Sequence, residues 1–260
     1  MSETPRPTYF YEEGDGRFAP TSLVVSPWDK RNQGGIPLAG LLAFTAERVP
    51  APAPMTPARF VIDLMHPTPI EAIESRARVI REGRRLQLVE AEIVAGGKVT
   101  ARASMLRVRV EDSPPSPGMA RVQAPPQEAR PFLAPQSRIT HMVESRLIQG
   151  GLEELGGGAT WLRLSGDVVR GTPMSPFVKS AIVADFGSGL SAFVDWRRWS
   201  FANLDISVHL SRLPAGAWIK LEAETMSAGE GVAIVDGLIS DEQGPVGRTH
   251  QTLFMERIRS

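Results

Sequence analysis

One aspartate in the second half of the chain lies on an apolar helical face, where a carboxylate is unexpected. Val178, Ala181, Ile182 and Gly189 stand at −7, −4, −3 and +4 from Asp185, so helical spacing places them on its side of a helix. A carboxylate there loses hydration, which raises its pKa unless hydrogen-bond donors stabilise the charge. The position suits a general base beside a cleft. A structural aspartate bonded to a neighbouring backbone group or arginine is the alternative.

An amide side chain is the second candidate. Gln251 shares a strand face with Leu253 and Met255, so we expect it to be buried and to need hydrogen-bond partners. A glutamine cannot act as a base, but it can orient a water molecule or a carboxylate. A satisfied structural amide is the alternative.

Asn203 is the third candidate, and its strand pattern raises a conflict. It falls on the polar face of an alternating run with Asp205, whereas the face that includes Leu204 is apolar. If the apolar face packs on the helix, Asn203 points away from Asp185. Either a bend at the strand start re-aims the asparagine, or the polar face lines the interface between the two halves. A turn or strand-start residue without function is the third interpretation.

Two further groups could meet a substrate. Gly34 and Gly35 precede a helix start, where free N–H groups favour a developing oxyanion, although a tight turn alone also explains them. Arg84 and Arg85 belong to a basic cluster beside a turn, which could bind phosphates. A solvated turn paired with Glu82 is the alternative for the arginines.

Composition narrows the chemistry. The 260 residues include no cysteine, which excludes disulfides, thiolate metal sites and a cysteine nucleophile. No complete Gly-x-Ser-x-Gly elbow occurs, and the four histidines lack metal-ligand spacing, so we expect neither a metal nor a cofactor. Lysine plus arginine and aspartate plus glutamate both number 29, and this balance argues against nucleic-acid or anionic-membrane binding. With no signal peptide at Met1–Pro7 and no apolar run of about 18 residues, a cytoplasmic protein is expected.

The elements that position these residues form two similar sets, and the expected class is α+β. Seven prolines mark residues 111–136 as an extended linker between units at 1–110 and 137–260. Each unit is predicted to be one helix packed on a curved antiparallel sheet, with the two sheets joined, because matching features recur about 146 residues apart. The predicted helices run from Gly34 to Arg48 and from Phe177 to Leu190. The predicted strands are Arg59–Met65, Glu71–Arg81, Leu86–Val94 and Val99–Val110, then Asn203–Leu210, Ala217–Met226, Val232–Ser240 and Val246–Met255.

This order resembles the double hotdog fold, and specifically the acyl-CoA thioesterase II family with its thioesterase-like relatives. The resemblance spans roughly residues 15–257 and is carried by an ordered set of segments: Trp28 with Gly34–Pro37, Arg78–Arg85, Ala184–Phe186, Asn203–His209 with Arg212, and Gly247–Gln251. It implies an active site of an aspartate, a glutamine and a hydroxyl residue that together hold a water molecule. Asp185 and Gln251 match, while Asn203 stands where the family has threonine.

The resemblance implies hydrolysis of acyl-CoA to a free acid and coenzyme A by direct attack of water. A hydratase or dehydratase acting on acyl thioesters, which would want a histidine beside the carboxylate, is the alternative enzyme. A non-catalytic acyl-thioester binding protein is the third possibility, and an assay of thiol release separates the three. Since two units lie in one chain, a monomer and a homo-oligomer are both compatible with the sequence.

Overall fold

A computed structural model describes residues 6–114, 122–134 and 137–258. In the first half, 3-10 turn Ser22–Val24 and helix α1 (Gly35–Glu47) accompany strands β1 (Thr8–Gly14), β2 (Arg17–Pro20), β3 (Met55–Leu64), β4 (Ile73–Glu82), β5 (Leu86–Ala95) and β6 (Lys98–Arg109). The second half has 3-10 turn Arg138–His141, helices α2 (Pro176–Ala184) and α3 (Gly187–Leu190), and strands β7 (Val143–Gln149), β8 (Gly158–Leu164), β9 (Asp167–Val169), β10 (Trp199–Leu210), β11 (Ile219–Ser227), β12 (Val232–Asp241) and β13 (Gly244–Arg257).

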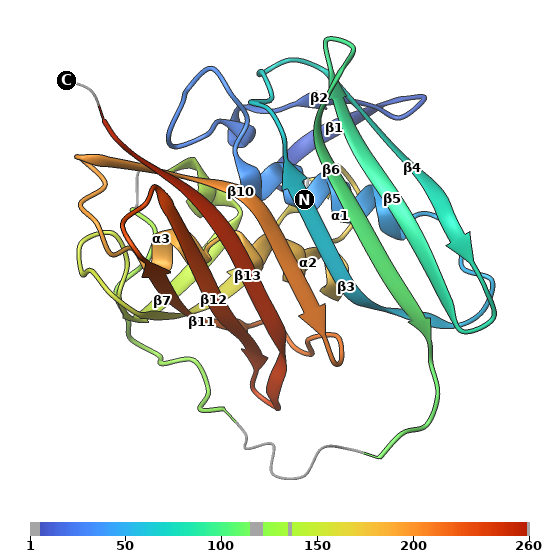
Figure 1. Ribbon diagram of the computed structural model, residues 1–260. Helices are drawn as coiled ribbons and strands as arrows, with labels where there is room; N and C mark the ends of the chain where they lie inside the picture. Colours follow the sequence, from blue (N-terminus) through green and yellow to red (C-terminus); the bar gives the residue numbers. More distant parts are fainter. Residues whose placement is uncertain (1–5, 115–121, 135–136, 259–260) are drawn as a thin grey trace, which may run out of the picture.

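All the strands join one sheet, in the order β7-β8-β11-β12-β13-β10-β3-β6-β5-β4-β2-β1-β9. The two halves have the same internal order, and they meet where β10 pairs antiparallel with β3. β9 breaks the pattern, because it comes from the second half and pairs parallel with β1 at the far edge of the first. The helices lie together on one face of the sheet (Figure 1).

The core lies between the sheet and the two long helices. Most of α1 is buried, because it packs on the sheet and also against α2. Gly40 permits this close approach: a Cβ added there would stand 3.0 Å from Val168 Cγ2 and 3.1 Å from Ile182 Cδ1. The helices run antiparallel, because the end of α2 at Asp185 meets the start of α1 at Gly35. The first turn of one helix therefore faces the last turn of the other.

The predicted order of a helix followed by antiparallel strands, twice, is observed, with two differences. The predicted helix Phe177–Leu190 is interrupted, since α2 ends at Ala184 and α3 begins at Gly187. The outer strands β1, β2, β7, β8 and β9 were not predicted. β2 and β9 have only 4 and 3 residues. β1 pairs with β2 and β7 with β8 nearby in the sequence, but the pairings that attach these strands to the rest of the sheet, such as β2 with β4 and β8 with β11, join distant segments.

The proline-rich segment is more than a spacer. Its described residues contain neither helix nor strand. Its second part docks on β7, because Leu147 N donates to Arg130 O at 2.9 Å and Arg146 Nη1 donates to Pro126 O at 2.7 Å. The Phe132 ring also packs edge-on against Phe186, with centroids 6.2 Å apart. Residues 115–121 and 135–136 of the predicted linker, and the N-terminal five, lie outside the described residues.

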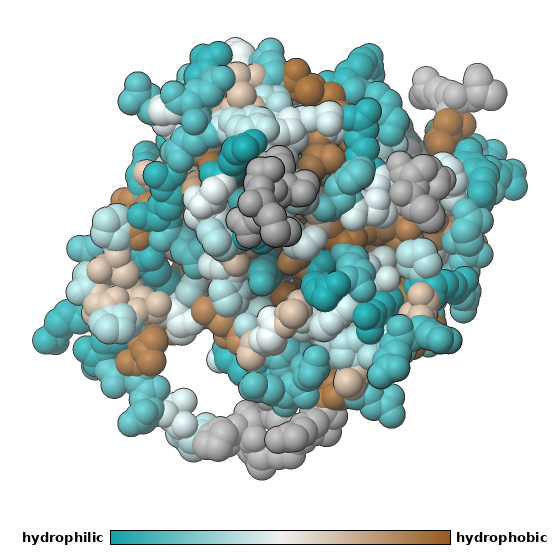
Figure 2. All heavy atoms as spheres, turned by 180° about the vertical axis from the view of Figure 1, so that it is seen from behind, coloured by the Kyte–Doolittle hydropathy of each residue, from teal (hydrophilic) through white to brown (hydrophobic). Residues whose placement is uncertain are grey.

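The side of the molecule away from the sheet is covered by loops. Its surface is mainly hydrophilic, and hydrophobic residues show mostly in recesses between hydrophilic ones (Figure 2). Among the helices described, none combines the length and the apolar character needed to cross a membrane.

Candidate active site

Asp185 follows the last residue of α2, and its carboxylate faces the start of α1. A Cβ placed on Gly35 would lie 2.9 Å from both carboxylate oxygens, closer than real Cβ atoms approach. Only glycine therefore fits at position 35 with the carboxylate where it is. The N-terminus of a helix carries partial positive charge, which favours the ionised form of a nearby acid. Gly35 thus places an electropositive backbone against the candidate base.

Asn203 reaches Asp185 because of a β-bulge. In the pairing of β10 with β13, Asn203 stands opposite Leu253 and Asp205 opposite Thr252, so Leu204 is an extra residue. The extra residue shifts the alternation by one and puts Asn203 on the inner face with Ile206. Asn203 Nδ2 then donates to Asp185 Oδ1 at 2.7 Å. Asn203 is thus re-aimed, as one of the arrangements considered from the sequence requires, but by a bulge inside β10, which begins at Trp199, and not by a bend at the strand start.

Gln251 is buried on the same inner face, as predicted, with 1% of its surface exposed. Its Nε2 donates to the carbonyl oxygen of Ala184 at 3.0 Å, which fixes the amide beside the residue that precedes Asp185. Its Oε1 lies 2.9 Å from where a Cβ on Gly187 would stand. The glycine after the α2 break therefore makes room for this amide.

The electrostatics of the site favour a base that works near neutral pH. Burial raises the pKa of Asp185 to about 6, and the hydrogen bond from Asn203 opposes part of that rise. Asn203 Oδ1 and Gln251 Oε1 are both buried and have no hydrogen-bond partner among the described residues. Native proteins seldom leave such atoms unpaired. A carboxylate with two amide oxygens nearby is suited to accepting hydrogen bonds from a bound water molecule.

The predicted substrate-binding residues do not all lie beside Asp185. Gly34 donates its N–H to Val24 O at 2.8 Å, so that amide is not free for an oxyanion and the expectation for it is wrong. Arg84 and Arg85 lie in the exposed β4–β5 turn, which packs near the C-terminal end of α1 through the Gln87 Nε2 to Pro50 O hydrogen bond. Helix α1 has 13 residues and is therefore about 20 Å long. The arginines are not brought to Asp185, and phosphate binding by them stays a prediction.

Tyr9 is a residue of the site that sequence reasoning missed. It is buried in β1, and its phenol interacts electrostatically with Asp185. The aromatic run Tyr9–Tyr11 was the available signal, but the neighbouring strand β9 comes from the other half. No grouping of three or more histidines, aspartates or glutamates suited to a metal occurs among the described residues. A metal-free mechanism stays a prediction.

Comparison with protein families decides the identity. A model of the acyl-CoA thioesterase N-terminal domain matches residues 24–108, and a model of the acyl-CoA thioesterase C-terminal domain matches residues 110–255. The chain belongs to the acyl-CoA thioesterase II family. It is accordingly a thioester hydrolase. No curated protein sequence is significantly similar to the chain as a whole.

Solved structures support a hotdog-type fold for this thioesterase. A conserved protein of unknown function with a hot dog fold from Alicyclobacillus acidocaldarius has a TM-score of 0.77 at 15% identity, covering 96% of each chain. An acyl-CoA thioesterase II from Mycobacterium marinum has a TM-score of 0.70 at 14% identity, again covering 96% of each chain. At these identities the likeness concerns the fold alone.

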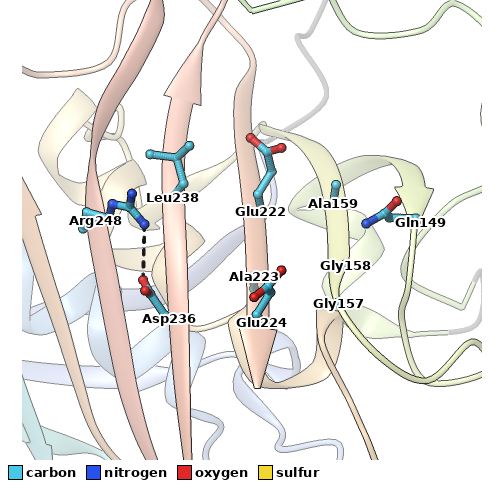
Figure 3. Close-up of a pocket in the computed structure, with 10 residues that line it drawn as sticks. All are labelled: Gln149, Gly157, Gly158, Ala159, Glu222, Ala223, Glu224, Asp236, Leu238 and Arg248. Atoms are coloured by element: carbon cyan, nitrogen blue, oxygen red, sulfur yellow. Dashed lines mark ion pairs between the residues drawn. The ribbon is translucent and has the colours of Figure 1, made fainter. Parts of the chain in front are cut away.

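A concavity lies on the face of the sheet opposite the helices (Figure 3). It has a volume of about 340 Å³, and β8, β11, β12 and β13 supply most of its lining. Asp236 pairs there with Arg248 at 3.6 Å, while Glu222 and Glu224 point to the same side. None of Asp185, Asn203 and Gln251 lines it. The candidate active site is therefore the buried group on the helix side, and this concavity is a charged surface.

Proposed function

We propose that this thioesterase hydrolyses acyl-CoA by direct attack of water, with Asp185 as general base. The observation that carries the proposal is a carboxylate with a pKa raised to about 6, held by Asn203 at the start of a helix. A base with a pKa near 6 is ionised at neutral pH yet still accepts a proton in the transition state. The residues present require no covalent intermediate.

The proposed steps balance as follows. Asp185 takes one proton from water while the water oxygen attacks the thioester carbonyl carbon, giving a tetrahedral oxyanion. The N–H groups at the start of α1, of which Gly35 is the nearest to Asp185, stabilise that charge. The intermediate then expels the coenzyme A thiolate, which receives the proton from Asp185. Free acid and coenzyme A leave, and the carboxylate is restored.

Asn203 and Gln251 would hold the attacking water. Their unpartnered oxygens, Asn203 Oδ1 and Gln251 Oε1, are acceptors. Water has two O–H groups and Asp185 takes the proton of one, so one of these two oxygens accepts a hydrogen bond from the other. Asn203 would thus take the place of the family's threonine. Like a threonine hydroxyl, it can present an acceptor to the water and a donor to Asp185 at the same time, but from two atoms and not from one.

The histidines support hydrolysis over hydration. His209 and His250 lie on the outer face of the sheet, where His250 Nδ1 is 3.8 Å from Asp236 Oδ1. The hydrogen bond to Asp185 comes from Asn203 instead. The acid–base partner expected of a hydratase is therefore replaced by an amide, which cannot shuttle protons.

The test is Asp185→Asn, assayed by thiol release from acyl-CoA substrates of increasing chain length. Loss of a general base lowers kcat by about 10²–10⁴-fold, and we expect a loss in that range. Asp195→Asn is the matched control, because Asp195 is a surface residue that caps the backbone N–H of Arg197. Asp185→Asn protein that is folded and turns over at the wild-type rate would contradict the proposal.

We also propose that residues 1–110 and 137–260 form a double hotdog, with the proline-rich segment as the connector. The matching strand order of the two halves and their shared sheet support this arrangement. A cytoplasmic location and the choice between monomer and homo-oligomer stay predictions from the sequence.

A further inference from the structure

Tyr9 belongs to the first half of the chain, yet its side chain reaches the site of the second. Only 1% of the residue is exposed, and its hydroxyl is buried with no hydrogen-bond partner among the described residues. Burial raises the pKa of the phenol above its ordinary value, and the Asp185 carboxylate raises it further because it would repel a phenolate. Tyr9 is therefore a protonated donor at neutral pH, where Asp185 is ionised.

In the part of the chain that the structure describes, the Tyr9 hydroxyl has no hydrogen-bond acceptor. Asp185 receives its side-chain hydrogen bond from Asn203, and the Tyr9 hydroxyl is unpaired although it lies within electrostatic range of the same carboxylate. Leaving a buried hydroxyl unpaired destabilises a protein by about 1–3 kcal/mol. Phenylalanine would fill the same space without that cost, so packing alone does not account for the phenol. A donor with these properties is explained if its acceptor belongs to the substrate.

We propose that Tyr9 is a catalytic residue that donates a hydrogen bond to the thioester carbonyl oxygen and to the oxyanion that forms on it. This role rests on the proposed hydrolysis at Asp185. The proton stays on Tyr9 throughout, so no further proton transfer is added to the reaction. Tyr9 and the start of α1 then donate hydrogen bonds to the carbonyl oxygen, while Asp185, Asn203 and Gln251 bind and activate the water. The first half of the chain supplies the electrophilic side of the site and the second half supplies the nucleophilic side.

The test is Tyr9→Phe, which removes one oxygen and keeps the ring. Removal of one oxyanion donor lowers kcat by about 10²–10³-fold, so we expect a loss of that size with KM changed by far less. Tyr11→Phe is the matched control. Tyr11 lies two residues along β1, is 42% exposed, and accepts a hydrogen bond from Arg170 Nη1 at 3.2 Å. The control should keep wild-type kcat and KM.

Two further measurements separate this role from its competitors. The loss in Tyr9→Phe should be the same for coenzyme A thioesters and for aryl thioesters, whose thiolates leave without protonation. A loss confined to coenzyme A thioesters would mean that Tyr9 protonates the leaving group, and would overturn the proposal. Urea unfolding should show Tyr9→Phe at least as stable as wild type. A kcat loss that merely follows a loss of folded protein would equally overturn the catalytic role.

The two proposals fail in different ways. Wild-type kcat in Tyr9→Phe, combined with inactive Asp185→Asn, overturns the role of Tyr9 and leaves the proposed function standing. Full activity in Asp185→Asn overturns the proposed function itself, whatever Tyr9→Phe does. Loss in both variants, with an unaltered apparent pKa in the pH profile of the residual Tyr9→Phe activity, supports both.

Discussion

The two halves of the molecule share a β-bulge in their central strand, but the side chains at the bulge differ. The central strands β3 and β10 both carry a bulge, between Pro57 and Arg59 in the first half and between Asn203 and Asp205 in the second. Pro57 and Asn203 are 146 residues apart, and so are Met105 and Gln251, which face the same point of the neighbouring strand. The second half thus has two amides where the first has proline and methionine. The bulge is therefore a feature of the fold in both halves, whereas the candidate site depends on which side chains lie at the bulge.

The first half has a buried polar cluster of its own, and it differs in being satisfied. Arg107, the counterpart of Leu253, donates to Gln87 Oε1 at 2.6 Å and to the carbonyl oxygens of Val49 and Pro50 at 2.6 and 2.8 Å. Neither Arg107 nor Gln87 has a buried side-chain atom without a partner. Around Asp185, by contrast, three buried oxygens of the described residues lack one, on Tyr9, Asn203 and Gln251. Buried atoms without a partner also occur elsewhere, on Arg59 and Ser240 among others, so it is the gathering of three such oxygens around one carboxylate that favours a place for substrate and water.

After replacement of Asp185 itself, replacement of Gly35 by a larger residue should lower the activity of the site most. A Cβ there would stand 2.9 Å from both carboxylate oxygens, so Gly35→Ala must displace the base. A misplacement of about 1 Å can lower the rate by about 10²-fold, and we expect at least that loss in kcat. Gly34→Ala is the comparison, because its nearest contact would be Ser26 Cα at 3.5 Å, and it should lose far less. Equal losses in the two variants would contradict the assigned geometry.

Gln251→Met places at position 251 the residue type that the first half has at its counterpart, Met105. Removing a group that orients the water should lower kcat by about 100-fold. The free energy of unfolding should change little, because the variant no longer buries an unpaired amide oxygen, which costs about 1–3 kcal/mol, but it also loses the hydrogen bond to Ala184 O. Rate assays and urea unfolding on the same preparation measure both effects. Met105→Leu, the conservative change at the counterpart, should leave the rate near wild type. A stability loss in Gln251→Met would indicate that the amide is structural.

The pH profile should report the raised pKa of Asp185. Since the base works ionised, kcat should be flat above pH 6 and fall about tenfold per unit below it. The stability effect has the opposite sign. A folded pKa raised from 3.8 to about 6 favours the folded state at low pH, and this contribution is lost as pH rises through about 6. Asp185→Asn should therefore gain stability over wild type between pH 4 and pH 8, by up to about 3 kcal/mol. Urea unfolding at both pH values measures the gain, and no gain would argue against the burial effect.

The sequence predicted the two long helices, the inner strands, and Asp185, Gln251 and Asn203 as candidate catalytic residues. Asp185 and Gln251 stood out because helical or strand spacing put a polar residue on an apolar face. Asn203 could not be placed, because one extra residue reverses the alternation and a bulge leaves no local mark. Tyr9 could not be found, because its neighbours come from the other half of the chain through β9 and α2. Pairing across such distances depends on tertiary packing, which periodicity does not encode.

The smallest effect on the rate should come from the first half's satisfied cluster. Arg107→Leu leaves Gln87 Oε1 and the Val49 carbonyl without their donor, while the Pro50 carbonyl keeps the bond from Gln87 Nε2, so the free energy of unfolding should fall by about 3 kcal/mol. Adding Gln87→Ala gives the first half the residue types that the second half has at Leu253 and Ala233. It removes the unpaired acceptor Gln87 Oε1 but also the donor to Pro50 O, so the double variant should lose less stability than the sum of the two single variants. Both should keep wild-type kcat per folded molecule. A large kcat loss in either would mean that the first half's cluster takes part in the chemistry.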